Sequence, residues 1–363
     1  MRSIKSGVKV IFFISILVAL IKICDDLVAE QAFSRLMMHD MYNYDENYTL
    51  AFLGASRTFM AFDPSIFDEN LDKCNSVNLG SVSQTLEGTY FLLKEFLNLH
   101  HPNMIIMEIS YGCYEDEVWE KHTPTPEYWL FDYMRPSINK VGYYFSVFNK
   151  ENYANALFPC YRNRSKLELS KIGEQFEQKY NSGYYQYLPF TNSDGWNYLS
   201  KGFVESHWCY ANKDLEPREP YEWDKNLIME SKIKYLKKIT DLCLSKDIDI
   251  IWITAPYPVY SLIDMGNYNE AHDYFDALAK KYNVEYYDFN YCHSRMLERN
   301  DYIYFYDASH MNNEYAKKFS NLVCQILTER ANGSLDYDNY FYRTFEEMIQ
   351  ECNEGSLYNY IED

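Results

Sequence analysis

Short apolar runs and longer stretches with one apolar face alternate along most of the chain. The short continuous runs are typical of buried strands, and the longer stretches are typical of helices. The pattern predicts strands over residues 48–53, 76–79, 104–109, 248–254 and 284–288, and helices over residues 84–99, 226–245, 268–282 and 313–329. This alternation predicts an α/β fold with a doubly wound parallel sheet and right-handed crossovers.

A separate apolar segment lies near the N-terminus. Val10–Ile21 is a run of twelve residues in which only Ser15 is polar, flanked by Lys9 and Lys22. A membrane span needs about 17–25 residues, and a signal-peptide core needs about 7–15. We favour an uncleaved anchor over residues 1–24, because no good cleavage site follows; a cleaved signal peptide is the alternative. Because basic residues precede the run, we expect the N-terminus on the cytoplasmic side of the cell membrane and the rest of the chain on the outer side.

The middle of the chain, residues 113–225, shows little regular pattern but many aromatic side chains. These are Trp119, Tyr128, Trp129, Phe131, Tyr143, Tyr144, Tyr184, Tyr185, Tyr187, Trp196, Trp208 and Trp223. One interpretation is a lid that stacks on sugar rings or covers an acyl pocket, and the other is a subdomain with its own aromatic core. The insertion divides the α/β domain into residues 25–112 and 226–330. The acidic tail, residues 331–363, is assigned no function.

Composition narrows the possible functions. A net charge of −19 argues against nucleic-acid binding, since such binding depends on Lys and Arg neutralising phosphates. The nine cysteines are scattered without a Cys-x-x-Cys pair, which indicates buried thiols, or one or two pairs that the sequence cannot assign. We expect no metal and no cofactor.

Candidate chemistry comes from two distant segments. Ser56 follows the predicted strand at 48–53 in a turn of small residues, and Asp307 and His310 lie three residues apart just before the last predicted helix. A serine becomes a good nucleophile when a histidine accepts its proton and a carboxylate orients that histidine. The three residues fit these roles in turn. The alternative is that Ser56 only caps a helix while the other two satisfy loop polar groups.

These segments resemble the conserved blocks of the SGNH (GDSL-like) serine hydrolases. Residues 54–57, Gly-Ala-Ser-Arg, resemble the first block with its nucleophile, and residues 307–310, Asp-Ala-Ser-His, resemble the last. Asn78-Leu79-Gly80 resembles the second block, whose glycine donates an N–H to the oxyanion hole. The resemblance implies a three-layer flavodoxin-like SGNH fold and an oxyanion hole formed by the N–H groups of Ser56 and Gly80.

The third block departs from the family. Residues 107–112 read Met-Glu-Ile-Ser-Tyr-Gly, without the usual oxyanion asparagine. Ser110, Tyr111 or Arg57 are candidates to replace it, although an ion pair at the sheet edge explains Arg57 equally well. Tyr257 is expected to line the same edge, because ligands bind at the carboxyl ends of parallel strands.

In this departure the chain is similar to a membrane-anchored branch of the superfamily. That branch includes the teichoic acid D-alanylation protein DltD and the alginate O-acetylation proteins. This resemblance implies an extracytoplasmic esterase or O-acyltransferase that acts on a cell-wall or surface glycan. The expected partners are an acylated glycan or acyl donor and, through the N-terminal helix, the membrane. The alternative is a non-catalytic accessory protein that assists a membrane-bound O-acyltransferase.

Overall fold

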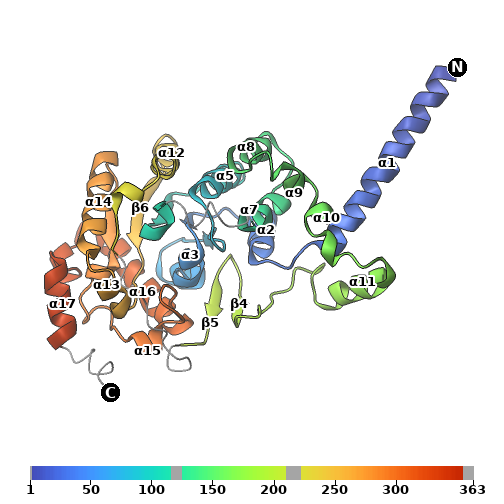
Figure 1. Cartoon of the computed structure of the whole chain (residues 1–363). Coiled ribbons are helices and arrows are strands. Elements are labelled where there is room, and N and C mark those ends of the chain that lie inside the picture. The colour runs from blue at the N-terminus through green and yellow to red at the C-terminus, as the bar shows by residue number, and fades with distance from the viewer. Residues whose placement is uncertain (1, 116–124, 210–221, 355–363) are drawn as a thin grey trace.

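The computed structural model describes residues 2–115, 125–209 and 222–354 (Figure 1). Its centre is a five-stranded sheet in the order β2-β1-β3-β6-β7, and every neighbouring pair is parallel. The strands are β1 (Leu50–Leu53), β2 (Ser76–Asn78), β3 (Met104–Glu108), β6 (Asp249–Thr254) and β7 (Glu285–Asp288). All five strand predictions are confirmed to within two residues. If the five strands of this sheet are numbered along the chain, their order is 2-1-3-4-5, which is the flavodoxin-like arrangement. The strand order reverses between β1 and β3.

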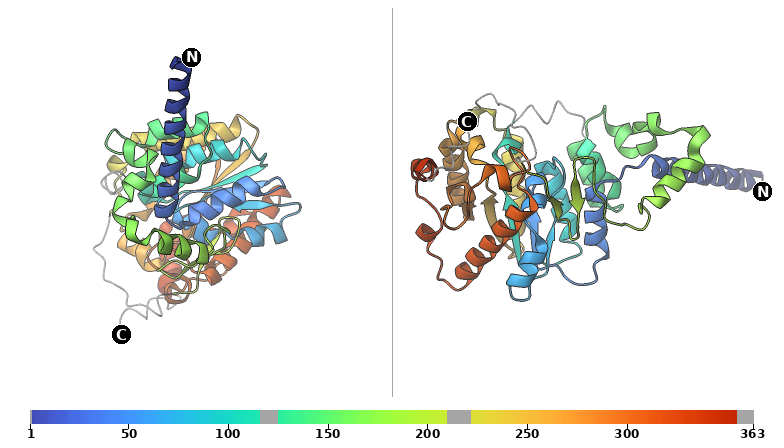
Figure 2. Two further views of the ribbon diagram at one scale, coloured as in Figure 1. Left: turned by 90° about the vertical axis from the view of Figure 1, so that its right-hand side faces the viewer. Right: turned by 90° about the horizontal axis from the view of Figure 1, so that it is seen from below.

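Helices cover both faces of the sheet (Figure 2). The chain forms α3 (Ser56–Ala61), α4 (Pro64–Asn70), α5 (Leu86–Phe96), α12 (Glu230–Leu244), α14 (Tyr268–Tyr282) and α16 (Asn313–Ala331). α5 packs beside α12, and α16 packs on α3 and α4. The predicted helix at 84–99 starts later, because the Thr85 side chain caps it by accepting the N–H of Gly88. The doubly wound α/β class predicted from the sequence is confirmed.

The connection between β3 and α12 is more regular than its sequence suggested. It contains α7 (Thr125–Tyr133), α8 (Ile138–Val147), α9 (Tyr153–Leu157), α10 (Pro159–Arg162), α11 (Ile172–Asn181) and the antiparallel pair β4 (Trp196–Tyr198) and β5 (Val204–Ser206). Ser137 caps α8 by accepting the N–H of Lys140. Tyr128, Phe131 and Tyr143 are buried, so aromatic side chains do build a core here. Trp119 lies outside the described residues.

The N-terminal helix α1 (Arg2–Val28) projects from the body (Figure 1). Gly7–Val28 is long and apolar enough to cross a membrane, with a hydropathy of 2.4 in its most apolar stretch, none of which is buried. Helix α2 (Phe33–Asn43) follows and is buried against the body. The segment therefore fits a membrane anchor or a signal sequence.

The C-terminal part packs on the body as far as it is described. It contains α13 (Val259–Asp264), α15 (Asp301–Tyr304) and α17 (Phe345–Glu354). Phe341 and Met348 are buried, and Phe341 pairs with Cys292 in an isolated bridge. Tail residues 355–363 lie outside the described part. The eight cysteines from Cys24 to Cys324 are free thiols.

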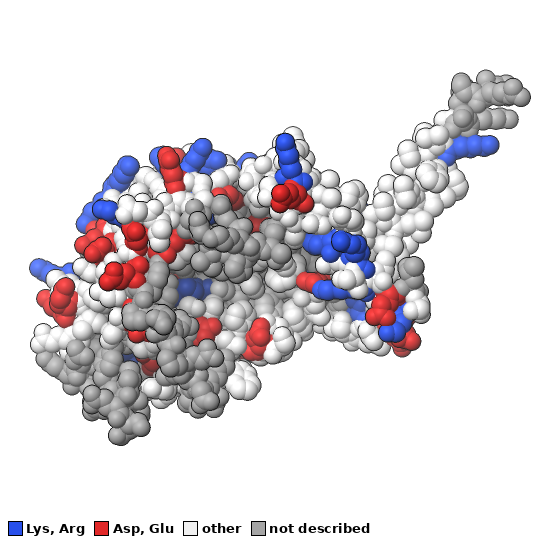
Figure 3. All heavy atoms as spheres, in the orientation of Figure 1, with Lys and Arg blue, Asp and Glu red and all other residues white. Residues whose placement is uncertain are grey.

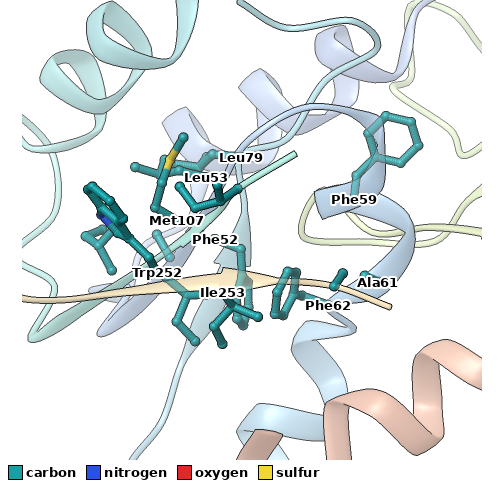
Figure 4. Packing of buried hydrophobic residues seen from close by; sticks show 14 of the residues in the cluster. Phe52, Leu53, Phe59, Ala61, Phe62, Leu79, Met107, Trp252 and Ile253 are labelled. Carbon is teal, nitrogen blue, oxygen red and sulfur yellow. The ribbon is translucent and has the colours of Figure 1, made fainter. Parts of the chain in front are cut away.

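The core lies directly behind the ends of the strands (Figure 4). Phe52 and Leu53 of β1, Met107 of β3 and Trp252 of β6 are all at most 1% exposed. Phe59 of α3 is equally buried and contributes to the same cluster. The carboxyl end of β1 and the helix after it are thus fixed by dense packing, which gives the turn between them a defined position.

Candidate active site

Ser56 lies in a tight turn between β1 and α3. Gly54 adopts φ +147°, and a Cβ at this position would lie 2.1 Å from Oγ1 of Thr58. Glycine is therefore required in the turn, which presents Ser56 as the first residue of α3. The first N–H groups of a helix have no carbonyl partner within it, so the N–H of Ser56 has no acceptor inside α3.

The Ser56 hydroxyl meets His310 from the far end of the chain. Oγ of Ser56 lies 2.7 Å from Nε2 of His310. Nδ1 of the same ring lies 2.9 Å from both carboxylate oxygens of Asp307. Because a carboxylate only accepts hydrogen bonds, the histidine proton lies on Nδ1 and Nε2 is left to accept from the serine. The three side chains form one continuous line of hydrogen bonds.

The loop between α15 and α16 holds Asp307 as a carboxylate. Its Oδ1 accepts the backbone N–H groups of Ser309 at 2.8 Å and His310 at 2.9 Å. Burial alone would raise the pKa of Asp307, but hydrogen bonds from His310 and from these N–H groups lower it from 3.8 to about 2. The carboxylate thus stays ionised at neutral pH, where it orients the imidazole and would stabilise an imidazolium.

Arg57, next to the serine, belongs to a buried ion pair. Its Nε lies 3.0 Å from Oε1 of Glu108, and both side chains are at most 6% exposed. The guanidinium also donates to the carbonyl oxygens of Ser309, at 3.0 Å, and Ala255, and its Cζ lies 3.4 Å from the centre of the Tyr257 ring. Arg57 therefore forms the ion pair at the sheet edge that the sequence left open as its alternative role, and a role as oxyanion donor stays a prediction. Tyr257 covers Arg57 at the sheet edge.

Ser110 and Tyr111 are also committed inside the domain. The Ser110 hydroxyl donates to Glu108, and the Tyr111 hydroxyl donates to Asp288 at 2.7 Å. Tyr111 is fully buried and Ser110 is 6% exposed. Both hydroxyls thus bond inside the domain, and a place for these side chains on the substrate side stays a prediction. Both hydroxyls donate to buried carboxylates. A buried carboxylate without hydrogen-bond partners costs free energy, so these hydroxyls face the interior although both residues follow the end of a strand.

Gly80 lies beside the nucleophile turn, but its N–H is occupied. It donates to Oδ1 of Asn78 at 3.0 Å, while Nδ2 of Asn78 donates to the carbonyl oxygens of Thr58 and Phe62 at 2.8 and 3.0 Å. The Gly80 N–H is therefore bonded within the chain, and its role as an oxyanion donor stays a prediction. Asn78 instead ties the loop after β2 to α3.

Trp196 is the residue near the site that the sequence did not single out. Its ring lies 5.3 Å from the His310 ring, 5.6 Å from the Tyr306 ring and 5.8 Å from the Phe59 ring, centroid to centroid. It comes from β4, so the aromatic insertion reaches the imidazole directly. The sequence showed it only as one of the aromatic side chains of residues 113–225, which does not reveal its partner.

A second Asp–His pair lies at the end of β7. Nδ1 of His272 is 3.0 Å from Oδ2 of Asp288, and this carboxylate also accepts the hydroxyl of Tyr268. Burial opposes ionisation of Asp288, but the hydrogen bond from His272 prevails and its pKa is lowered. Among the described residues, the other hydrogen-bond partners of Asp288 are tyrosines and Asn290 and not a serine, so the pair serves as a buried polar network. Within the described ranges, no three His, Cys, Asp or Glu side chains gather as metal ligands.

Comparisons with known proteins give structural likeness only. No family model and no curated protein matches the chain. A proposed acylhydrolase of Bacteroides fragilis is 11% identical, with a TM-score of 0.38 over 83% of this chain and 99% of its own. A GDSL-like lipase of Bacteroides thetaiotaomicron is 9% identical, with a TM-score of 0.35 over 79% of this chain and 88% of its own. Because these scores are low, the chemistry is inferred from the side chains described above.

Proposed function

We propose that the chain is a serine-dependent acyl-transfer enzyme of the SGNH (GDSL-like) type. The observation that carries the proposal is the line of hydrogen bonds from Ser56 through His310 to Asp307. The carbonyl carbon of an acyl ester is attacked by Oγ of Ser56 while Nε2 of His310 takes the hydroxyl proton. The tetrahedral intermediate then collapses, the histidine returns the proton to the leaving alcohol, and an acyl-serine remains.

The second half of the reaction decides between hydrolysis and transfer. Either water or a sugar hydroxyl gives its proton to His310 and attacks the acyl-serine, which regenerates Ser56. We propose that a cell-wall or surface glycan donates or accepts the acyl group, as in the O-acylation branch that the chain resembles. The support is the position of Trp196 against the imidazole, since an indole beside the reacting atoms offers a stacking surface for a sugar ring.

We propose that α1 is an uncleaved anchor and that the enzyme lies outside the cell membrane. The residues just after the apolar segment are built into the body, which supports an anchor over a removed signal peptide. Oδ1 of Asp25 accepts the N–H of Cys160 at 2.8 Å, and the carbonyl of Ala29 accepts Nζ of Lys179 at 2.8 Å. Protease added to intact cells should digest the domain, and the chain should remain with membranes; a soluble form lacking about 25–32 residues would contradict the anchor.

A non-catalytic accessory protein that works beside a membrane-bound O-acyltransferase is the second candidate. It is favoured by one observation, the engagement of the Gly80 N–H with Asn78, which leaves the oxyanion donors incomplete. A retained serine and histidine without a formed oxyanion hole would bind an acyl group but turn it over poorly.

Labelling with a fluorophosphonate probe separates the two candidates. An activated serine forms a covalent phosphonyl ester, so the wild-type chain should be labelled and Ser56→Ala should not. Ser81→Ala is the matched control, because Ser81 is a buried serine of the adjacent loop, 2% exposed. Absence of labelling in the folded wild type would overturn the enzymatic proposal and favour the accessory protein.

A further inference from the structure

The helices α8 to α11, which we call the collar helices, lie on the part of the body from which α1 projects, with α10 and α11 beside its base (Figure 1). α1 contacts α10 and α11 directly. The Tyr185 hydroxyl, which follows α11, donates to Oδ2 of Asp26 at 2.5 Å. α8 packs on α7, which is tied to the residues after α1 because Nε1 of Trp129 donates to Oε2 of Glu30 at 3.0 Å. The collar helices are therefore fixed beside the point where a membrane-spanning α1 would leave the bilayer.

The collar helices expose apolar stripes instead of burying them. On α8, Ile138, Val141 and Phe145 are 92%, 56% and 64% exposed, and on α11, Ile172, Phe176 and Tyr180 are 38%, 51% and 55% exposed. Spacings of three and four residues place each set on one helix face. A surface helix of a globular protein turns such a face towards the core. Here the faces have no core to cover.

Basic side chains accompany these stripes. Between residues 157 and 180 the sequence has five Lys or Arg and three Asp or Glu, although the chain as a whole carries a net charge of −19. Figure 3 shows Lys and Arg on the body beside the base of α1, with Asp and Glu next to them. Apolar faces rimmed by basic residues are typical of helices that lie in the interface of a bilayer with anionic lipids.

We propose that the apolar faces of α8 and α11 rest in the lipid interface around α1, so that the collar helices are a membrane-binding surface. The proposal goes beyond the enzymatic function and rests on α1 being an anchor. A single membrane-spanning helix would leave the orientation of the domain relative to the bilayer undefined. Contacts from the collar helices fix its orientation, and with it the height of Ser56 above the membrane.

Photocrosslinking of the full chain in vesicles of phosphatidylcholine and phosphatidylglycerol tests this surface. Phe145 and Phe176 are each replaced by p-benzoylphenylalanine. Ile303 of α15 is the matched control, because it is 51% exposed, like Phe176, and lies away from α1 (Figure 1). We expect lipid adducts at positions 145 and 176 and none at 303, detected by mass spectrometry of the tryptic peptides.

Three outcomes would overturn the proposal. Equal adducts at all three positions would mean non-specific reaction, and protein–protein adducts at 145 and 176 would mean that another polypeptide covers the stripes. Failure of the chain to float with the vesicles would remove the anchor as well. Fluorophosphonate labelling of the same samples reports on Ser56 independently, so loss of the membrane surface and loss of the enzymatic function are distinguishable.

Discussion

Arg57 and Glu108 form a buried ion pair that joins the residue after Ser56 to the last residue of β3. Their Nε and Oε1 atoms are 3.0 Å apart. Because Arg57 also donates to the Ser309 carbonyl, the pair links the turn that carries Ser56 to the loop that carries His310. The ion pair and this hydrogen bond therefore help to fix the position of the Ser56 turn relative to the His310 loop.

Breaking this pair from one side should be strongly destabilising. Glu108→Leu leaves the Arg57 guanidinium buried without its carboxylate, which costs about 3–5 kcal/mol in other proteins. Adding Arg57→Met should recover part of the loss, so the double variant should be less destabilised than the sum of the single variants. Urea unfolding of all four forms in detergent measures this. Simple additivity would show that the two side chains do not interact energetically.

Removal of either reacting group should abolish most of the activity. We expect Ser56→Ala and His310→Ala to lower kcat on p-nitrophenyl acetate by similar factors, roughly 10³-fold or more, because the triad acts as one unit. Asp307→Asn should be milder. Ser309→Ala, which removes a hydroxyl 3.2 Å from Nδ1 of His310, is the control and should retain most activity. A folded His310→Ala variant with near wild-type kcat would show that another group is the base.

The Asp307 carboxylate should stabilise the fold in a defined pH range. Its pKa in the folded chain is about 2, below the ordinary value of 3.8, so the folded state binds this proton less readily than the unfolded state. The stabilisation is complete above 3.8 and is lost as the pH falls towards 2. The melting temperatures of wild type and Asp307→Asn should therefore differ at neutral pH and converge in acid. A constant difference would mean that the carboxylate charge does not matter.

The strands, and the proximity of Ser56, Asp307 and His310, could be predicted from sequence because both depend on local pattern. Continuous apolar runs such as residues 104–109 mark buried parallel strands, and the carboxyl ends of such strands meet at one edge. That geometry brings Ser56 to the edge of β1 before any coordinate is known. The Asp307 to His310 spacing then identifies a loop that can supply both remaining groups.

The side chains around the triad could not be predicted, because their partners are distant in sequence. Arg57 and Glu108 are 51 residues apart, and Tyr111 and Asp288 are 177 apart. No periodicity reports such pairs, and a polar residue after a strand is compatible with facing either substrate or core. The helices between residues 125 and 181 escaped prediction because their apolar residues divide between a local core and an exposed face, which blurs the usual amphipathic signal.

Trp196 should act as a positioning residue for His310. Trp196→Ala removes an aromatic contact worth about 0.5–1.5 kcal/mol, so kcat/KM should fall about 2- to 12-fold. Trp196→Phe should restore part of the loss, since a smaller ring keeps the contact. Trp208→Ala is the matched control, because Trp208 belongs to the same insertion and is 49% exposed. A fall in kcat at constant KM would separate positioning of the imidazole from sugar stacking, which would raise KM instead.

Gly80 should tolerate no side chain, and its variant also probes the oxyanion hole. A Cβ there would lie 2.8 Å from the carbonyl oxygen of Ala55, so the turn before Ser56 must shift. Gly80→Ala should cost about 1–3 kcal/mol, as overpacking does elsewhere. Gly112→Ala is the control, because a Cβ there meets nothing within 4 Å. If the Gly80 N–H turns from Asn78 to the oxyanion during the reaction, Gly80→Ala should lower kcat far more than its loss of stability explains. Equal kcat in Gly80→Ala and Gly112→Ala would mean that the Gly80 N–H donates only to Asn78.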